Sequence, residues 1–354
     1  MKQGVLLLNL GSPEALSVPA IREYLDEFLM DGRVIDLPHW SRRLLVSYML
    51  GPKKRPQVKI EEYGRIWTDE GSPLLATSRH VQEKIQKSFD FPIDLAMMYA
   101  KPDIASALDR LQQAGVTDLF IMPLYPQYAM SSYETVVVKT MGLIKGLGSP
   151  FTVSLLPPFF ADDDYITALV DASKPFLEKD FDHLLFTFHG IPERHLRKSD
   201  PSHEHCMVTK DCCATCHPAH STCYRHQCLR TADEFVRKAG IPEEKCSVAF
   251  QSRLGKDPWL EPYTDQVLRA YGKRGYKKLL MISPAFVSDC LETLEEIGMG
   301  GKEEYQHAGG RDFELIPCLN EHPSWIQFLE GRIRKWSEGE NGIHSIGKLA
   351  QISS

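Results

Sequence analysis

The stretch that decides the fold lies at residues 183–194 and reads His-Leu-Leu-Phe-Thr-Phe-His-Gly-Ile-Pro-Glu-Arg. Its apolar, aromatic-rich run 184–188 is typical of a buried strand in a parallel sheet. His189, Gly190 and Pro192 then end the strand and turn the chain. Because ligands bind at the carboxyl ends of the strands in an open α/β sheet, we expect His189 at the edge of a crevice. Its spacing fits both a proton-exchanging histidine and a structural histidine in the turn.

Strand patterns alternate with helix patterns along the chain, which predicts an α/β fold built from βαβ units with parallel sheets. The expected strands cover residues 4–10, 93–99, 118–123, 151–156, 183–188, 246–250, 278–283 and 313–317. The expected helices cover residues 17–29, 73–88, 102–114, 132–146, 162–178, 228–239, 258–273, 288–297 and 323–336.

Two strand ends in the first part of the sequence resemble two strand ends in the second part. The matched segments are 8–14 with 187–193 and 126–135 with 284–293. The resemblance is either chance or the trace of two related α/β halves, and its preserved order favours the second interpretation. Two such halves would form a cleft, with Leu10 and His189 at equivalent positions.

We expect these halves at residues 1–160 and 161–322, followed by a helix at 323–336 and a loose tail at 337–354. Residues 31–68 do not follow the alternation of strand and helix patterns. They are predicted to form either an amphipathic lip over the cleft that touches a membrane surface or a helix packed on the domain.

The composition is that of a globular protein, with 354 residues, 43% of them hydrophobic and 25% charged. A net charge of −6 argues against a nucleic-acid binder. The sequence contains no apolar run of the ~18–20 residues needed to cross a bilayer, and its N-terminal apolar run is too short for a secretion signal. We therefore expect a cytoplasmic protein.

Six of the nine cysteines fall within residues 203–228, namely Cys206, Cys212, Cys213, Cys216, Cys223 and Cys228. Without a secretion signal, such a cluster favours metal or iron–sulfur ligation over disulfides. Four thiolates suffice for a [2Fe–2S] centre, so spacing leaves open which two are surplus. Structural zinc, aided by His217 or His220, is the alternative.

Three acidic residues, Asp289, Glu292 and Glu296, follow the strand expected at 278–283. On a helix they would share one face, where mutual repulsion favours binding of a cation or of protons. A solvated, acidic helix start is the alternative.

Aromatic and apolar residues at other strand ends could line a broad, flat pocket, although such a set is also typical of an ordinary core. They are Leu10, Tyr99, Tyr125, Tyr128, Trp259 and Phe286.

Six motifs, in this order, resemble those of the ferrochelatases, enzymes that insert Fe(II) into protoporphyrin IX in the last step of haem synthesis. The motifs are Leu-Leu-Asn-Leu-Gly-Ser-Pro-Glu at 7–14, Gly-Ser-Pro-Leu at 71–74, Tyr-Pro-Gln-Tyr at 125–128, Phe-His-Gly-Ile-Pro at 188–192, Pro-Trp-Leu at 258–260 and the run from Ser283 to Leu294. The resemblance extends from about residue 4 to residue 336. It implies two Rossmann-like halves enclosing a porphyrin cleft, and a lyase.

The resemblance also implies roles for individual residues. His189 would accept pyrrole protons or bind the metal, and Glu292 would face it across the macrocycle. Asp289 and Glu296 would continue an acidic metal path. This division fits the chemistry, because metal cannot enter a porphyrin that still carries two N–H protons in its core, and a base must take them. Leu10, Tyr99 and Trp259 match positions in the family's pocket wall.

The sequence departs from the animal members of this family at two positions. Cys290 replaces a histidine, which puts a metal ligand there in doubt, and Met98 replaces an arginine. The cysteine-rich insert resembles the internal cluster of some microbial ferrochelatases. This implies a [2Fe–2S] cluster on Cys206, Cys212, Cys213 and Cys223, with Cys216 and Cys228 as alternates.

The expected partners are protoporphyrin IX and Fe(II), with a homodimer and a peripheral membrane contact left open. The alternatives to a ferrochelatase are a chelatase for another divalent metal and tetrapyrrole, and a tetrapyrrole carrier without catalysis.

Overall fold

The computed structural model describes residues 1–51, 55–209, 211–253, 255, 257–339 and 344–345. The chain divides into two compact units, each with its own sheet. Unit 1 consists of Met1–Leu124, Ser131–Pro158 and Ile326–Ser354, and unit 2 consists of Tyr125–Met130 and Phe159–Trp325. The loop Tyr125–Met130 therefore belongs to unit 2, although it directly follows a strand of unit 1.

The sheet of unit 1 has the strand order β2-β1-β3-β4-β9. Its strands are β1 (Gln3–Asn9), β2 (Ile93–Met97), β3 (Asp118–Pro123), β4 (Thr152–Leu155) and β9 (His344–Ser345). The first four are parallel, and β9 pairs antiparallel with β4. β1 lies in the interior of the sheet, which explains its continuous apolar run Val5–Leu8, fully buried.

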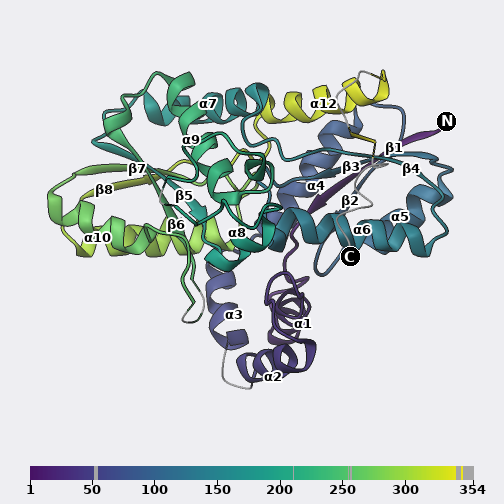
Figure 1. Cartoon of the computed structure of the whole chain (residues 1–354), viewed down its shortest axis with the longest axis horizontal. Helices are drawn as coiled ribbons and strands as arrows, with labels where there is room; N and C mark the ends of the chain where they lie inside the picture. The colour runs from purple at the N-terminus through teal and green to yellow at the C-terminus, as the bar shows by residue number, and fades with distance from the viewer. Residues whose placement is uncertain (52–54, 210, 254, 256, 340–343, 346–354) are drawn as a thin grey trace. The chain divides into compact units, whose positions relative to one another are not determined.

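The helices of unit 1 are α1 (Val18–Leu29), α2 (His39–Met49), α3 (Arg55–Ile66), α4 (Pro73–Gln86), α5 (Ile104–Gln113), a π-helix at Met130–Glu134 and α6 (Thr135–Gly146). In Figure 1, α1, α2 and α3 form a group to one side of the sheet of this unit. The helix α12 (Pro323–Ser337) begins in unit 2 and ends in unit 1, where Trp336 stacks on Phe120.

Unit 2 contains an all-parallel sheet with the order β6-β5-β7-β8. The strands are β5 (His183–His189), β6 (Cys246–Gln251), β7 (Lys278–Ile282) and β8 (Asp312–Leu315). The helices are α7 (Asp163–Leu177), α8 (Glu193–Ser199), α9 (Tyr224–Ala239), α10 (Thr264–Arg274), a π-helix at Glu292–Gly301 and α11 (Lys302–His307), with short 3₁₀ turns at Pro218–Ser221 and Glu243–Lys245. Figure 1 shows α7 and α9 on one face of this sheet and α10 on the other.

The two sheets share one topology. In each, the first strand along the chain lies between the second and the third, and the fourth lies beyond the third. A π-helix follows the third strand in both units. The shared order supports the repeat inferred from the sequence, and the eight predicted strands are confirmed within a few residues.

Four predicted helices differ from the structure. The helix expected at 132–146 begins as the π-helix Met130–Glu134 and continues as α6. The helix expected at 258–273 begins only at Thr264, because Pro262 cannot continue a helical hydrogen-bond ladder. Its carbonyl instead accepts the Phe250 N–H at 2.8 Å. The helix expected at 288–297 becomes the π-helix, and the helix expected at 228–239 begins at Tyr224.

Residues 31–68 contain α2 and α3 rather than one helix. In the tail expected at 337–354, β9 is the described strand, and residues 340–343 and 346–354 lie outside the described residues. Among the helices that the structure describes, none has both the length and the apolar character needed to cross a membrane.

Candidate active site in unit 2

The sheet of unit 2 brings His189 and Glu292 to the same edge. β5 and β7 are neighbours, paired up to Phe186 and Ile282, and His189 is the last residue of β5. Glu292 opens the π-helix that follows β7. Because parallel strands end at a common edge, His189 and the segment that leads from β7 to Glu292 both start from the edge where α/β sheets bind ligands. Both residues are half-buried.

The hydrogen bond of His189 defines the tautomer of its ring. Nδ1 lies 2.7 Å from the carbonyl oxygen of Gly190. A carbonyl can only accept, so Nδ1 carries a proton and, in the neutral ring, Nε2 keeps a lone pair. The ring is thereby oriented as a base.

Gly190 is needed because two strand ends approach closely here. Its N–H donates to the Gln251 carbonyl at 2.6 Å. A Cβ at this position would lie 2.9 Å from the same carbonyl oxygen and 3.3 Å from that of Ser252. The equivalent Gly11 of unit 1 has φ +106°, and a Cβ there would lie 2.0 Å from the Tyr99 carbonyl oxygen.

Cys290 interacts with Glu292 as a hydrogen-bond donor. Burial, and next the charge of Glu292, raise the pKa of the Cys290 thiol well above its usual range. The thiol therefore stays protonated and hydrogen-bonds with the Glu292 carboxylate. This position supplies a donor to Glu292 rather than a thiolate.

Asp289 lies before the π-helix, so the expectation that it shares a helix face with Glu292 and Glu296 is wrong. Its two carboxylate oxygens already accept hydrogen bonds from Asn320 Nδ2 at 2.6 Å, Thr293 Oγ1 at 3.1 Å and the Cys318 N–H at 3.3 Å. Glu292 and Glu296 do lie on one face, since the i to i+5 bonds of a π-helix align residues four or five apart.

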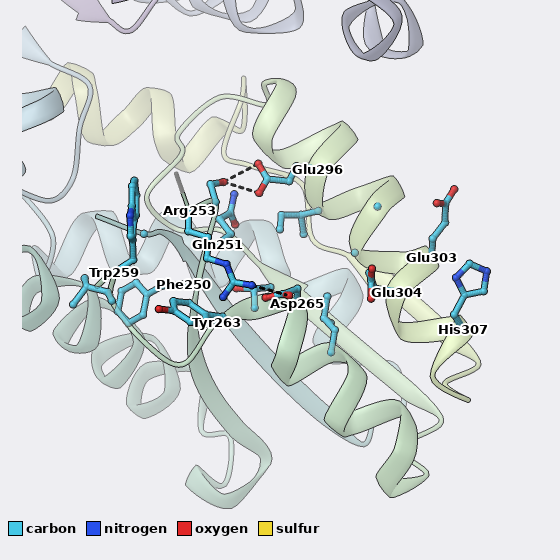
Figure 2. Close-up of a pocket in the computed structure, with 18 residues that line it drawn as sticks. Phe250, Gln251, Arg253, Trp259, Tyr263, Asp265, Glu296, Glu303, Glu304 and His307 are labelled. Atoms are coloured by element: carbon cyan, nitrogen blue, oxygen red, sulfur yellow. Dashed lines mark hydrogen bonds and ion pairs between the residues drawn. The ribbon is translucent and has the colours of Figure 1, made fainter. Parts of the chain in front are cut away.

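A cavity of about 580 Å³ lies in unit 2 beside this edge (Figure 2). Gly190, Trp259 and Glu296 are among its lining residues, whereas His189 and Glu292 are not. The hydroxyl of Ser252 donates to the Glu296 carboxylate, with its oxygen 2.6 and 2.8 Å from the two acceptors. The cavity thus combines an aromatic wall with a carboxylate held by a neighbouring hydroxyl.

The other predicted porphyrin contacts are distributed over both units. Leu10 and Tyr99 belong to unit 1, where Tyr99 is only 1% exposed and its hydroxyl donates to Asp31 at 2.9 Å. Tyr125, Tyr128 and Phe286 belong to unit 2. Burial raises the pKa of the Tyr125 hydroxyl far above its usual range. Among these six residues, Trp259 is the one that lines the described cavity.

Sequence reasoning missed Gln251, a second polar residue at this edge. It ends β6 and is 4% exposed, and its Oε1 accepts a hydrogen bond from Thr187 at 2.8 Å. Its Nε2 has no hydrogen-bond partner among the residues that the structure describes. Its position at the end of the strand next to β5 was the signal that could have identified it.

The cysteine-rich insert gathers four thiols. The thiol of Cys223 hydrogen-bonds with those of Cys213 and Cys206, and Cys212 lies close enough to influence the ionisation of Cys206 and Cys213. Cys216 is exposed instead. Cys228, fully buried, hydrogen-bonds with Tyr224. In the described part of the chain, no group of three or more His, Cys, Asp or Glu residues is arranged to hold a metal ion. The gathered cysteines are free thiols that hydrogen-bond with one another.

A cation and a helix N-terminus lie beside these thiols. Cys223 is the N-cap of α9, where the backbone N–H groups of Arg225 and His226 favour the anionic form of its thiol. The hydrogen bond from Cys213, followed by these N–H groups, lowers the pKa of Cys223 to about 6. The Arg225 guanidinium lies 4.0 Å from the sulfur of Cys212. This donor set suits an anionic thiolate-bound group.

Four histidine rings pack against the same loop. His205 stacks on His217 at 3.8 Å between ring centroids, and His220 stacks on His226 at 3.7 Å. Nε2 of His205 and Nε2 of His220 lie 2.8 and 3.0 Å from the Cys212 carbonyl oxygen. These imidazoles therefore support the backbone of the insert.

Comparison with known proteins decides the family. A family model described as Ferrochelatase matches residues 2–336. The chain belongs to the ferrochelatase family. The ferrochelatase of Opitutus terrae is 48% identical over 342 residues, covering 96% of this chain and 99% of its own length. That of Azotobacter vinelandii is 49% identical over 328 residues, covering 92% and 96%.

The solved structure of SirB from Bacillus subtilis with Fe3+ shares the fold, with a TM-score of 0.55 at 13% identity over 96% of this chain and 98% of SirB. The resemblance seen in the sequence is thus confirmed. The chain is a metal chelatase, a lyase, with the activity of a protoporphyrin ferrochelatase in haem biosynthesis.

Proposed function

We propose that unit 2 carries the chemistry of iron insertion, with Nε2 of His189 as the acceptor of the pyrrole protons. The observation behind this assignment is the hydrogen bond from Nδ1 to Gly190, which leaves Nε2 with its lone pair facing away from that partner. Two N–H protons leave the porphyrin as Fe(II) enters, so a base at this edge performs a step that the reaction requires.

Glu292 is proposed as the carboxylate that receives the iron, together with His189. Glu296, four residues further along the π-helix, continues the acidic path into the cavity. Asp289 adds negative charge to this path from a fixed position, because its oxygens are already hydrogen-bonded. Carboxylate oxygens suit a divalent ion that is bound weakly and then released.

The porphyrin is proposed to contact the aromatic and apolar set predicted from the sequence. The residues are Leu10, Tyr99, Tyr125, Tyr128, Trp259 and Phe286. Trp259 has the strongest support, because it lines a cavity large enough for part of a macrocycle. The domain bounds expected from the sequence also remain predictions: halves at 1–160 and 161–322, and a lip at 31–68.

Substitution of His189 tests the assignment. We expect His189→Ala to lower turnover about 10²- to 10⁴-fold, the usual contribution of a general base, while protoporphyrin still binds. His80→Ala serves as the control, since His80 is a histidine of unit 1 paired with Glu70. Turnover by His189→Ala within about twofold of wild type would contradict the assignment, and a wild-type protein that binds porphyrin without metal insertion would be a carrier.

We further propose that Cys206, Cys212, Cys213 and Cys223 hold a [2Fe–2S] cluster. Their mutual contacts, the helix N-terminus at Cys223 and the cation of Arg225 support four thiolates around an anionic group. Such a cluster would supply one-electron redox chemistry. Iron, sulfide and zinc analysis with a visible spectrum tests this: Cys223→Ser should lose the cluster and Cys216→Ser should keep it. Stoichiometric zinc without sulfide would favour the structural-zinc alternative.

We propose that the protein is cytoplasmic. We also propose that its lip, residues 31–68, contacts a membrane surface. Trp40, Leu44 and Tyr48 are 68%, 66% and 70% exposed and lie four residues apart along α2. Such a face favours insertion into a bilayer interface. Trp40→Ser with Leu44→Ser should abolish vesicle co-sedimentation, and Val208→Ser, a change at another exposed apolar residue, should not. The molar mass in solution tests the homodimer.

A further inference from the structure

The buried side chain of Gln227 connects two segments that the reaction scheme treats separately. Gln227 lies in the first turns of α9 and has no exposed surface. Its Oε1 accepts the N–H of Tyr128 at 2.7 Å. Its Nε2 donates to the carbonyls of His220 at 3.1 Å and Ser221 at 2.9 Å. One amide thus joins the cysteine-rich insert to the loop Tyr125–Met130.

The connection continues to a sulfur-bearing residue. The ring of His220 donates from Nε2 to the carbonyl of Cys212 at 3.0 Å, while its own carbonyl is held by Gln227. The N–H of Gln227 also donates to the carbonyl of Cys223 at 3.1 Å. Hydrogen bonds therefore lead from two of the gathered cysteines to the backbone of Tyr128 without a gap.

A second contact holds the same loop. Gln127, which is 2% exposed, donates from Nε2 to Oγ1 of Thr231 at 2.9 Å, one turn further along α9. The Thr231 hydroxyl in turn lies 2.8 Å from the carbonyl of Phe160, to which it donates. Because a buried amide or hydroxyl group is costly to leave without a partner, these bonds hold the loop to the helix.

We infer that Gln227 is a positioning residue through which the metal state of the cysteine-rich insert sets the conformation of the loop Tyr125–Met130, and so the affinity for porphyrin. The inference rests on the proposed porphyrin contacts of Tyr125 and Tyr128. Thiols released from a metal reorient, the carbonyls of Cys212 and His220 shift with them, and Gln227 transmits the shift. Metal binding and porphyrin binding then favour each other.

The affinity for protoporphyrin tests this inference. It is measured by titration of the full-length protein with metal bound at the insert and again after a chelator has removed it, and the metal content is measured in both states. In wild type, stripping should weaken porphyrin binding about 5-fold or more, the lower end of typical coupling. Gln227→Leu should bind porphyrin weakly in both states. Its KM for porphyrin should rise while kcat at saturation stays near wild type.

The chain provides a matched control in unit 1. Gln86 makes the same three bonds, since Nε2 donates to the carbonyls of Phe89 and Phe91, both at 3.0 Å, and Oε1 accepts the Ile93 N–H at 2.8 Å. Gln86→Leu removes an equivalent set of hydrogen bonds and should keep the wild-type ratio of affinities. Equal affinities in the two states of wild type, or loss of the ratio in Gln86→Leu, would overturn the inference.

A pair of variants at Thr231 covers the case in which Gln227→Leu does not fold. Thr231→Val keeps the shape and removes the acceptor for Gln127, so it should reduce the effect of stripping, and Thr231→Ser should restore it. A protein that takes up no metal at the insert overturns both the cluster assignment and this inference. The His189→Ala experiment reports on the proposed chemistry independently, because it does not involve the insert.

Discussion

Asn320 holds Asp289 from two sides: its Nδ2 donates to Asp289 Oδ2 at 2.6 Å, and its Oδ1 accepts the Asp289 N–H at 2.8 Å. Asn320 has φ +45°, a left-handed conformation that asparagine tolerates better than most residues. Thr293, one residue after Glu292, binds the same carboxylate. The pair therefore anchors the segment from which the π-helix starts.

Asn320→Ala should lower the free energy of unfolding by about 1.5–3 kcal/mol, because it leaves a partly buried carboxylate without its closest donor. Urea denaturation measures the change. A loss below about 0.5 kcal/mol, the size expected for a neutral surface substitution, would show that the anchor is not needed.

Gly190→Ala should disrupt the site without altering any charge. The added Cβ would lie 2.9 Å from the Gln251 carbonyl oxygen, so β5 and β6 must separate where His189 is presented. We expect loss of stability of about 1–3 kcal/mol and a fall in kcat. Gly142→Ala, where a Cβ meets nothing within 4 Å, is the control. Normal kcat in Gly190→Ala would contradict the argument.

Stability should fall in mild acid because of His183 in β5. Burial lowers the pKa of His183 from 6.5 to about 4, so the unfolded chain binds a proton more readily than the folded protein. The stabilisation is therefore complete above pH 6.5 and is lost as the pH falls to about 4. One proton changes the free energy of unfolding by at most about 1.4 kcal/mol per pH unit. In denaturant titrations across this range, His183→Gln should show a flatter pH dependence than wild type, and equal slopes would contradict the assignment.

Tyr165→Phe should destabilise the segment that follows β7. The Tyr165 hydroxyl is fully buried and donates to the Pro284 carbonyl at 2.5 Å. Without it that carbonyl loses a buried partner, which costs about 1–3 kcal/mol. Thermal unfolding measures the loss, and Tyr48→Phe, at a tyrosine that is 70% exposed, should leave the melting temperature nearly unchanged.

The sheets were predictable because their strands are buried runs with a clear pattern, and the placement of His189 followed from its position after such a run. The π-helices were not predictable, since an amphipathic pattern is compared with a period of 3.6 residues and Asp289 fits that period by chance. Pro262 could have shown that the helix expected at 258–273 begins after it. The partner of its carbonyl, the Phe250 N–H in β6, could not be predicted from local sequence.

Contacts between distant segments account for the rest. Tyr128 and Gln227 are 99 positions apart, and no local pattern relates them. Tyr99 was expected as a wall residue from its type and position, but its bond to Asp31 depends on how α1 and the following turn pack. Local sequence thus identified which elements form, whereas the partners of buried polar groups required the folded chain.

The π-helices of the two units carry glutamates at corresponding positions, and these glutamates have different neighbours. In unit 1, Glu134 ends its π-helix and forms an ion pair with Arg33 at 2.9 Å, which ties down the start of the lip segment. In unit 2 the corresponding Glu292 has a neutral thiol beside it instead of a guanidinium. The carboxylate of Glu134 is thus neutralised by a cation, whereas that of Glu292 receives a hydrogen bond from a neutral thiol, so a difference in one neighbour gives two corresponding glutamates different electrostatic surroundings.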